Sequence, residues 1–272
     1  MKKLVLLLST FIFSISTFAA GGFTWISTLI HTPAMQKFLH MIGLDHDPKK
    51  SEHVVTLVLI GIILCIVGLI YRSKISKVKD VVVPDKKTSF RNFIELYGNF
   101  IYGQCKSIIG EKEGPTYFPF IATVFLVILI CNLIGLIPGF LPPTEHLSTT
   151  FAFGMFVFVY YNLKGCKEQG TWNYIKHFAG PLWYLAFLIF PIEIISNAIR
   201  PLSLALRLKS NMMGDHMVLA TFSDLAPMLI PIIFMILGIL VSFIQAYVFT
   251  ILTMVYIQMA VVHHDHDEEH AH

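Results

Sequence analysis

Charged residues are scarce in this sequence. Only 14% of its 272 residues are Asp, Glu, Lys or Arg, and 55% are hydrophobic, whereas about 25% of the residues of an average soluble domain are charged. This composition excludes an ordinary soluble domain and predicts a protein that crosses a membrane several times. The net charge of +3 is not a strongly basic excess, so no nucleic-acid partner is expected.

Paired cysteines and catalytic motifs are also missing. The four cysteines lie far apart and include no CxxC pair, so neither a zinc site nor a redox pair is indicated. The sequence has no glycine-rich phosphate loop, no HExxH motif and no GxSxG motif. We therefore expect no covalent chemistry, no cofactor and no metal site, and predict that the chain is not itself an enzyme.

Long apolar stretches with helical spacing make up most of the chain. Residues 88–110 repeat apolar side chains every three or four positions, which predicts an amphipathic helix that lies along a membrane surface or packs on neighbouring elements. Together these stretches predict an all-α polytopic membrane protein with about five membrane-embedded helices. The expected spans are 54–71, 118–137 and 151–163, and two longer helices are expected at 181–221 and 231–262.

The basic residues give a predicted orientation. Residues 72–87 contain one arginine and five lysines, and a second basic loop follows at 164–176. Basic loops lie on the cytoplasmic side of a membrane. The N-terminal segment 21–52 is therefore expected outside, and the His- and acid-rich tail 263–272 inside, with the protein in a bacterial inner membrane.

The first 20 residues have the order of a signal peptide. Two lysines are followed by an apolar run and then by small residues. We expect this peptide to be cleaved, and a retained signal anchor is the alternative. Residues 21–272 are then predicted to form a single membrane domain.

The two longer helices are too long to stand upright in a membrane. Residues 181–221 would extend about 60 Å at a rise of 1.5 Å per residue, whereas the hydrocarbon core is about 30 Å thick. We predict a steeply tilted hairpin of the last two helices. The first of them must tilt or break, and Pro191 and Pro201 are the expected positions of kinks.

A polar stripe follows this first helix. Glu193, Arg200 and Arg207 are spaced by seven residues, and Asn197 and Asn211 follow Glu193 and Arg207 by one helical turn. A charge at the centre of a membrane helix costs about 2.5–3.5 kcal/mol, so it is retained where it has a function. Snorkelling toward the headgroups is the alternative for Glu193 and Arg200. It suits Arg207 poorly, because apolar residues extend in both directions from it.

Gln245 is a polar side chain within the apolar run VSFIQAYVF. Counting from the turn of the hairpin places it at about the depth of Arg207. A buried amide needs hydrogen-bond partners, and we expect Arg207 or channel water to supply one. The same count places His216 opposite residues 235–238, where Gly238 leaves room.

Three segments resemble the a subunit of F-type ATP synthase, the stator subunit beside the rotating c-ring. They are RPLSLALRLKSNMMGDH at 200–216, IQAYVFTILTMVYIQMA at 244–260, and NLIGLIPGFLPPTEHLSTT at 132–150. The resemblance implies a proton-translocating stator subunit with two offset half-channels. It implies as partners the c-ring, b-type peripheral stalk subunits, the soluble ATPase sector and the lipid bilayer.

The resemblance also implies roles for the residues of the stripe. Arg207 matches the arginine that faces the c-ring carboxylate, and Glu193 is assigned to the cytoplasmic half-channel. Other positions are expected to take part in proton translocation beside the arginine or in the external half-channel. They are Asn211 and Gln245 beside Arg207, and His216, Asp215 and Glu145 in the external half-channel.

Two positions depart from the pattern of many bacterial members. Those members carry Glu at the position of His216 and His at the position of Gly238. The mitochondrial type carries His at the first position and an acid at the second, so this chain has the histidine without that acid. Asp215, next to His216, is the candidate to stand in for it.

The alternative functions are a secondary transporter and a membrane scaffold. A secondary transporter with an ionisable site at the membrane midplane usually has internal repeats, and none is found here. A membrane scaffold that transports nothing would make the polar stripe dispensable. Co-isolation with a small oligomeric hairpin protein and a soluble ATPase distinguishes the stator subunit from both.

Overall fold

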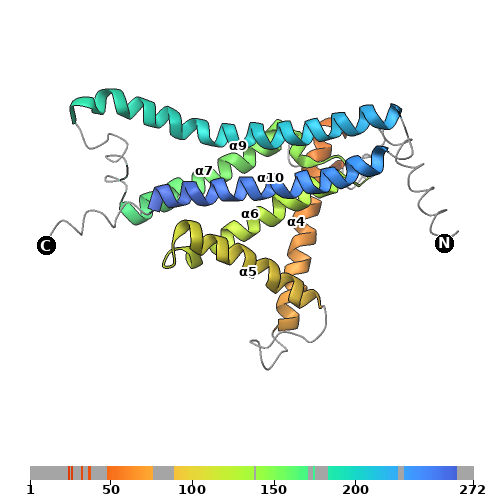
Figure 1. Ribbon diagram of the computed structural model, residues 1–272, viewed down its shortest axis with the longest axis horizontal. Coiled ribbons are helices and arrows are strands. Elements are labelled where there is room, and N and C mark those ends of the chain that lie inside the picture. The colour runs from red at the N-terminus through yellow and green to blue at the C-terminus, as the bar shows by residue number, and fades with distance from the viewer. Residues whose placement is uncertain are drawn as a thin grey trace. The chain divides into compact units, whose positions relative to one another are not determined.

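The computed structural model describes residues 24, 26, 32, 36, 37, 48–75, 89–137, 139–170, 174, 183–225 and 230–261. Within these ranges the chain forms six α-helices and one short 3-10 helix (Figure 1), so the predicted all-α class is confirmed. The predicted signal peptide, residues 76–87 of the lysine-rich loop and the tail lie outside the described residues. The helices are α4 (Pro48–Ile75), α5 (Phe90–Ile109), α6 (Gly114–Ile134), α7 (Leu147–Gln169), α9 (Trp183–Leu225) and α10 (Ile230–Val261), and the 3-10 helix is η1 (Pro143–Glu145).

Four of the described helices are long and apolar enough to cross a membrane, namely α4, α6, α9 and α10. The remaining predicted span, at 151–163, lies in α7, which is longer than predicted. The prediction ended it before Lys164, but lysine is a good helix former. The helix has 23 residues and ends where Gly170 takes a positive φ of 79°, a conformation that favours glycine after a helix end.

Helix α9 is a single helix of 43 residues that continues through both internal prolines. Of the two predicted alternatives, a tilted helix or a broken one, the continuous helix excludes the break, and the kinks expected at Pro191 and Pro201 stay a prediction. A proline in a helix interior removes one backbone hydrogen bond, but the helix backbone remains the conformation that satisfies most polar groups in lipid. At 1.5 Å per residue α9 is about 65 Å long, which exceeds the thickness of the hydrocarbon core.

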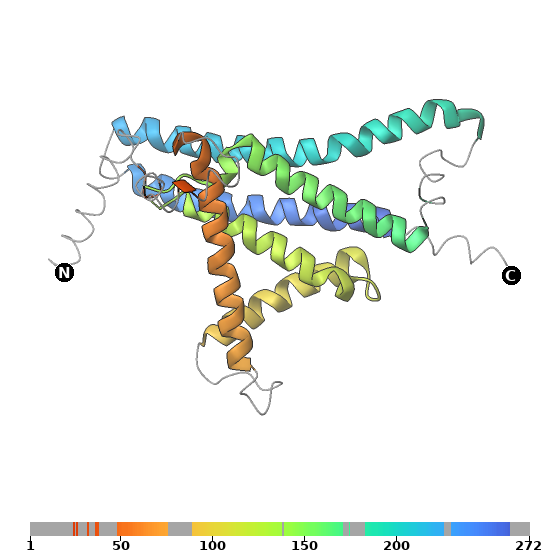
Figure 2. The ribbon, with the colours of Figure 1, turned by 180° about the vertical axis from the view of Figure 1, so that it is seen from behind.

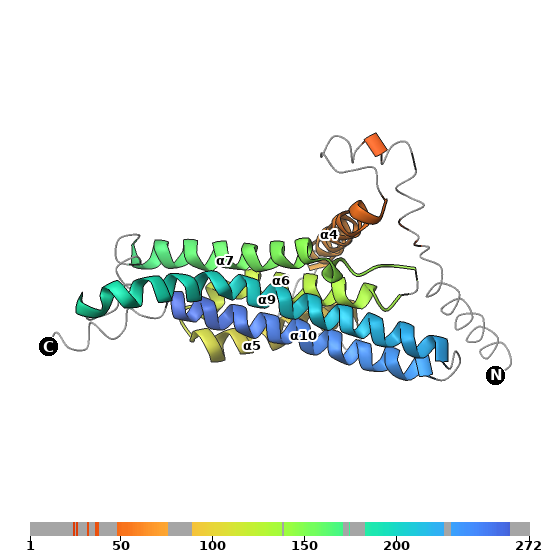
Figure 3. The same ribbon diagram turned by 90° about the horizontal axis from the view of Figure 1, so that it is seen from above.

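The chain divides into two compact units. The first comprises residues 1–66, 126–150 and 207–246. Within it the end of α9 lies beside the start of α10 (Figures 1 and 3), and Phe222 stacks on Phe234 with ring centroids 4.8 Å apart. Leu208 and Met212 are fully buried on the inner side of α9.

The second unit comprises residues 67–125, 151–206 and 247–272. Here α7 lies directly against α9 (Figure 2). A Cβ atom added to Gly154 would come within 2.5 Å of the backbone oxygen of Pro201. Only glycine permits that approach, because any larger residue would force the two helices apart.

Helix α5 has the predicted position and amphipathic pattern. It buries Ile101 and Cys105, and Tyr97 donates a hydrogen bond of 2.5 Å to the backbone oxygen of Ala122 in α6. Its apolar residues are not all buried, since Phe93 is 70% exposed. This mixture is compatible with the predicted surface helix, which contacts protein on one side and lipid on another.

Candidate functional site

Arg207 extends from the middle of α9 and is exposed. Two other arginines of the described helices form ion pairs, each within its own helix. Arg91 pairs with Glu95, and Arg200 pairs with Glu193. Among the described residues Arg207 has no ion-pair or hydrogen-bond partner. An arginine is effectively always charged, so this guanidinium is available to a group on another molecule.

One turn after Arg207, Asn211 donates a hydrogen bond from Nδ2 to Gln245 Oε1. Gln245 is only 3% exposed, and its Nε2 finds no hydrogen-bond partner among the described residues. Asn211, and not Arg207, is thus the described partner of Gln245 Oε1, and the expectation that channel water supplies a partner stays a prediction. The counted depth was useful, but a count cannot distinguish two residues that are one helical turn apart.

The His216 side chain of α9 contacts the segment that precedes α7. Its Nδ1 lies 3.3 Å from Glu145 Oε2, and its Nε2 lies 3.2 Å from the backbone oxygen of Gly135. The His216 ring holds the pKa of the Glu145 carboxyl below its ordinary value, although burial acts in the opposite direction. Glu145 is therefore ionised at neutral pH.

Asp215 contacts Gly238 of α10. A Cβ atom at Gly238 would lie 2.8 Å from Asp215 Oδ2 and 2.7 Å from a methyl carbon of Leu136. The counted depth, which places His216 opposite residues 235–238, agrees with this contact of its neighbour Asp215, while the His216 side chain itself contacts Glu145. A carboxylate of α9 therefore lies next to Gly238.

A buried amide holds the loop that carries Glu145. Thr144 donates a hydrogen bond of 2.9 Å to Asn132 Oδ1, and Asn132 Nδ2 lies 3.5 Å from the backbone oxygen of Ser242 in α10. Thr144 and Asn132 are fully buried. These contacts tie the end of α6, the loop and α10 together, and so position Glu145 beside His216.

A second polar cluster lies in the other unit. Glu193 Oε1 lies 3.6 Å from Arg200 Nη2, and the Arg200 guanidinium lies over the Tyr256 ring at 5.3 Å. Both charges of the pair are thus within one helix, with α10 supplying the aromatic face. A cation over an aromatic face is stabilised by the ring electrons.

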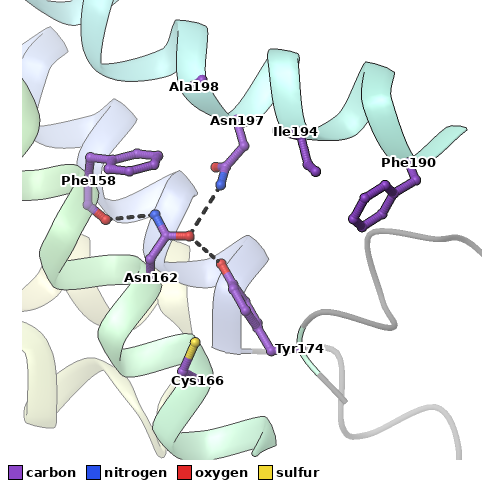
Figure 4. Close-up of a pocket in the computed structure, with 8 residues that line it drawn as sticks. All are labelled: Phe158, Asn162, Cys166, Tyr174, Phe190, Ile194, Asn197 and Ala198. Atoms are coloured by element: carbon purple, nitrogen blue, oxygen red, sulfur yellow. Dashed lines mark hydrogen bonds between the residues drawn. The ribbon is translucent and has the colours of Figure 1, made fainter. Parts of the chain in front are cut away.

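Asn197, on the next turn, is at the centre of a hydrogen-bond network. It accepts a bond of 2.6 Å from the Tyr161 hydroxyl and donates to Asn162 Oδ1 at 3.2 Å, which also accepts from the Tyr174 hydroxyl at 2.9 Å. Figure 4 shows the bonds of Asn162 to Asn197 and Tyr174 beside a cavity of about 410 Å³. Sequence reasoning missed the α7 contribution, although Asn162 is a polar residue in a mostly aromatic stretch.

The family comparison decides the class of the protein. The model of a family described as "ATP synthase A chain" matches residues 54–258, which is most of the sequence. The chain belongs to this family. It is therefore the proton-translocating stator subunit of an F-type ATP synthase, a non-catalytic membrane subunit, and the transporter and scaffold interpretations are set aside.

Relatives within the family agree over nearly their full lengths. The ATP synthase subunit a of Bdellovibrio bacteriovorus is 46% identical over 224 residues, which cover 82% of this chain and 96% of that protein. The subunit a of Geobacter sulfurreducens is 49% identical over 195 residues, covering 72% and 83% respectively. The subunit a 2 of Syntrophotalea carbinolica is 45% identical over 233 residues, covering 86% and 93%.

Proposed function

We propose that Arg207 is the fixed charge that faces the carboxylates of a c-ring. The observation that carries this proposal is an exposed guanidinium, on a long apolar helix, without a partner among the described residues. A neighbouring positive charge favours the ionised form of a carboxyl group. Proton-driven ATP synthesis by assembled complexes that carry Arg207→Ala tests it.

The Asn211–Gln245 pair supports the same assignment. The pair lies one helical turn from Arg207 and is joined by a hydrogen bond. The free Nε2 of Gln245 can bind a water molecule or the passing carboxylate. This polar pair stabilises charged groups beside Arg207. Because the pair is itself uncharged, it does not compete with the rotor carboxylate as a counter-ion for Arg207.

The external half-channel is assigned to Glu145, His216 and Asp215. These side chains lie between α9, α10 and the loop before α7, and two of them form the 3.3 Å contact. Imidazole can accept a proton on one nitrogen and release one from the other near neutral pH. His216 therefore relays protons between Glu145 and the acceptors nearer Arg207.

The cytoplasmic half-channel is assigned to the second cluster. Glu193 is its acid, and Asn197 with the tyrosine hydroxyls forms a hydrogen-bonded polar surface along one cavity. The peripheral stalk and the soluble ATPase sector complete the complex in this proposal. Because α9 carries residues of both half-channels, one helix positions the two routes.

The proposed orientation is tested by cysteine labelling. In a background without the four native cysteines, a cysteine at Asp80 is expected to react only from the cytoplasmic side, because its loop is basic. Leu147, which is 42% exposed, is expected to react only from the external side. Thr144 is unsuitable because it is fully buried. The background protein without an added cysteine is the control, and exchanged sidedness would contradict the orientation.

The second cluster is tested by Glu193→Gln and Arg200→Ala. Removing the acid is expected to slow ATP synthesis roughly threefold, since a proton-transfer group is lost. Arg200→Ala is expected to change the rate less than about twofold, because a half-exposed ion pair contributes little. Glu111→Gln, which removes an exposed acid from a turn, is the matched control. A larger effect of Arg200→Ala than of Glu193→Gln would reverse the assignment.

A further inference from the structure

A pair of stacked histidines lies near Glu145, outside the residues assigned above. His53 from the start of α4 and His146 have ring centroids 4.3 Å apart and an interplanar angle of 21°. Ser148 Oγ lies 3.2 Å from His53 Nε2 and so fixes the orientation of that ring. All three residues belong to the first compact unit, together with Glu145 and His216.

Buried polar atoms without partners accompany this pair. Glu52 is 4% exposed, and among the described residues neither its Oε1 nor His53 Nδ1 has a hydrogen-bond partner. The same is true of Ser242 Oγ and Gln245 Nε2 in the same unit. Buried polar atoms are normally satisfied by protein or by ordered water. Each of these atoms can therefore bind a water molecule.

Several charged or titratable groups face the pair. Glu52 and Glu145 are acids whose charge acts on His146, while His216 and Lys209 act on Glu145. Two stacked imidazolium rings repel each other, whereas one charged and one neutral ring do not. A positive charge on one ring is balanced by the neighbouring carboxylates.

We propose that His53 and His146 form a two-histidine relay at the mouth of the external half-channel, which collects protons from water and passes them to Glu145 and His216. This inference rests on the proposed function and orientation. In each transfer one ring nitrogen gains a proton from water while the other nitrogen releases one, so the ring returns to its original charge. His146 is adjacent to Glu145 in the sequence, which gives the released proton a nearby acceptor.

The relay predicts a specific dependence on external pH. When protons are scarce outside, a collecting group near neutral pH maintains the supply. His53→Gln keeps a side chain that can bond to Ser148 but carries no proton. We expect its rate of ATP synthesis to be near that of the wild type at external pH 6 and roughly threefold lower at pH 8. His146→Gln is expected to behave alike, and the double variant no worse than either single variant.

The measurement uses inverted vesicles that contain the whole complex, with lumenal pH varied at constant total proton-motive force. Assembly is checked by co-purification. His270→Gln, which removes a histidine of the C-terminal tail, is the matched control and should keep the wild-type pH profile.

The outcomes separate the relay from the function on which it rests. An unchanged profile in both histidine variants, or the same fractional loss at every pH, would overturn the relay, because a structural role of the stacked pair predicts no pH dependence. If Arg207→Ala remains inactive in the same vesicles, only the relay fails. ATP synthesis by assembled Arg207→Ala complexes would overturn the proposed function itself.

Discussion

ATP synthesis by complexes that carry Arg207→Ala is expected to fall to background while the complex still assembles. Arg207 is exposed and has no partner among the described residues, so its loss leaves no broken ion pair inside the subunit. Without this positive charge nothing keeps the passing rotor carboxylate ionised. The rotor site then stays protonated between the half-channels, and rotation is no longer coupled to proton transfer.

Arg207→Lys is expected to fail largely as well. An ammonium group is a compact point charge that loses its proton more readily when it is buried, and it lacks the planar fork of the guanidinium. The measurement is ATP synthesis in inverted vesicles, with assembly verified by co-purification. Arg200→Ala is the matched control, because it removes the same side chain two helical turns away. Robust synthesis by a fully assembled Arg207→Ala complex would rule out the proposed mechanism.

Helix positions and the polar stripe were predictable because they depend on local properties. Apolar runs set α4, α6 and α10 to within a few residues, since burial in lipid requires a continuous apolar helix. The end of α7 was not predictable from hydropathy, because Gly170 and not the first lysine stops the helix. The continuity of α9 through two prolines depends on lipid and neighbouring helices, not on local propensity.

Contacts within the site were predictable only to about one helical turn. Counting residues in a hairpin gives depth but not direction, so it matched Gln245 to the level of Arg207 but did not identify Asn211 as its partner. It likewise matched His216 in depth to residues 235–238, but whether Asp215 or His216 faces Gly238 depends on direction, which changes by about 100° between consecutive helix residues. The α7 network around Asn162 was missed because a single amide in an aromatic stretch has no periodic pattern.

The contact between His216 and Glu145 makes the second large prediction. Each of His216→Ala and Glu145→Gln is expected to slow ATP synthesis and passive proton flux roughly 100-fold, which is the lower end of the usual contribution of a positioned proton-transfer group. Because the two side chains are 3.3 Å apart, they act on the same proton. The double variant is therefore expected to be no slower than the slower single variant.

A double-mutant cycle on proton flux measures this coupling. Asp215→Asn supplies the comparison, since Asp215 lies against Gly238 and not against Glu145. If Asp215 stands in for the missing acid, its loss slows flux by a separate step, and the effects of Asp215→Asn and Glu145→Gln add on a logarithmic scale. Additive effects of His216→Ala and Glu145→Gln would instead mean that the two residues serve different steps. Normal flux in His216→Ala would transfer the relay to Asp215 and water.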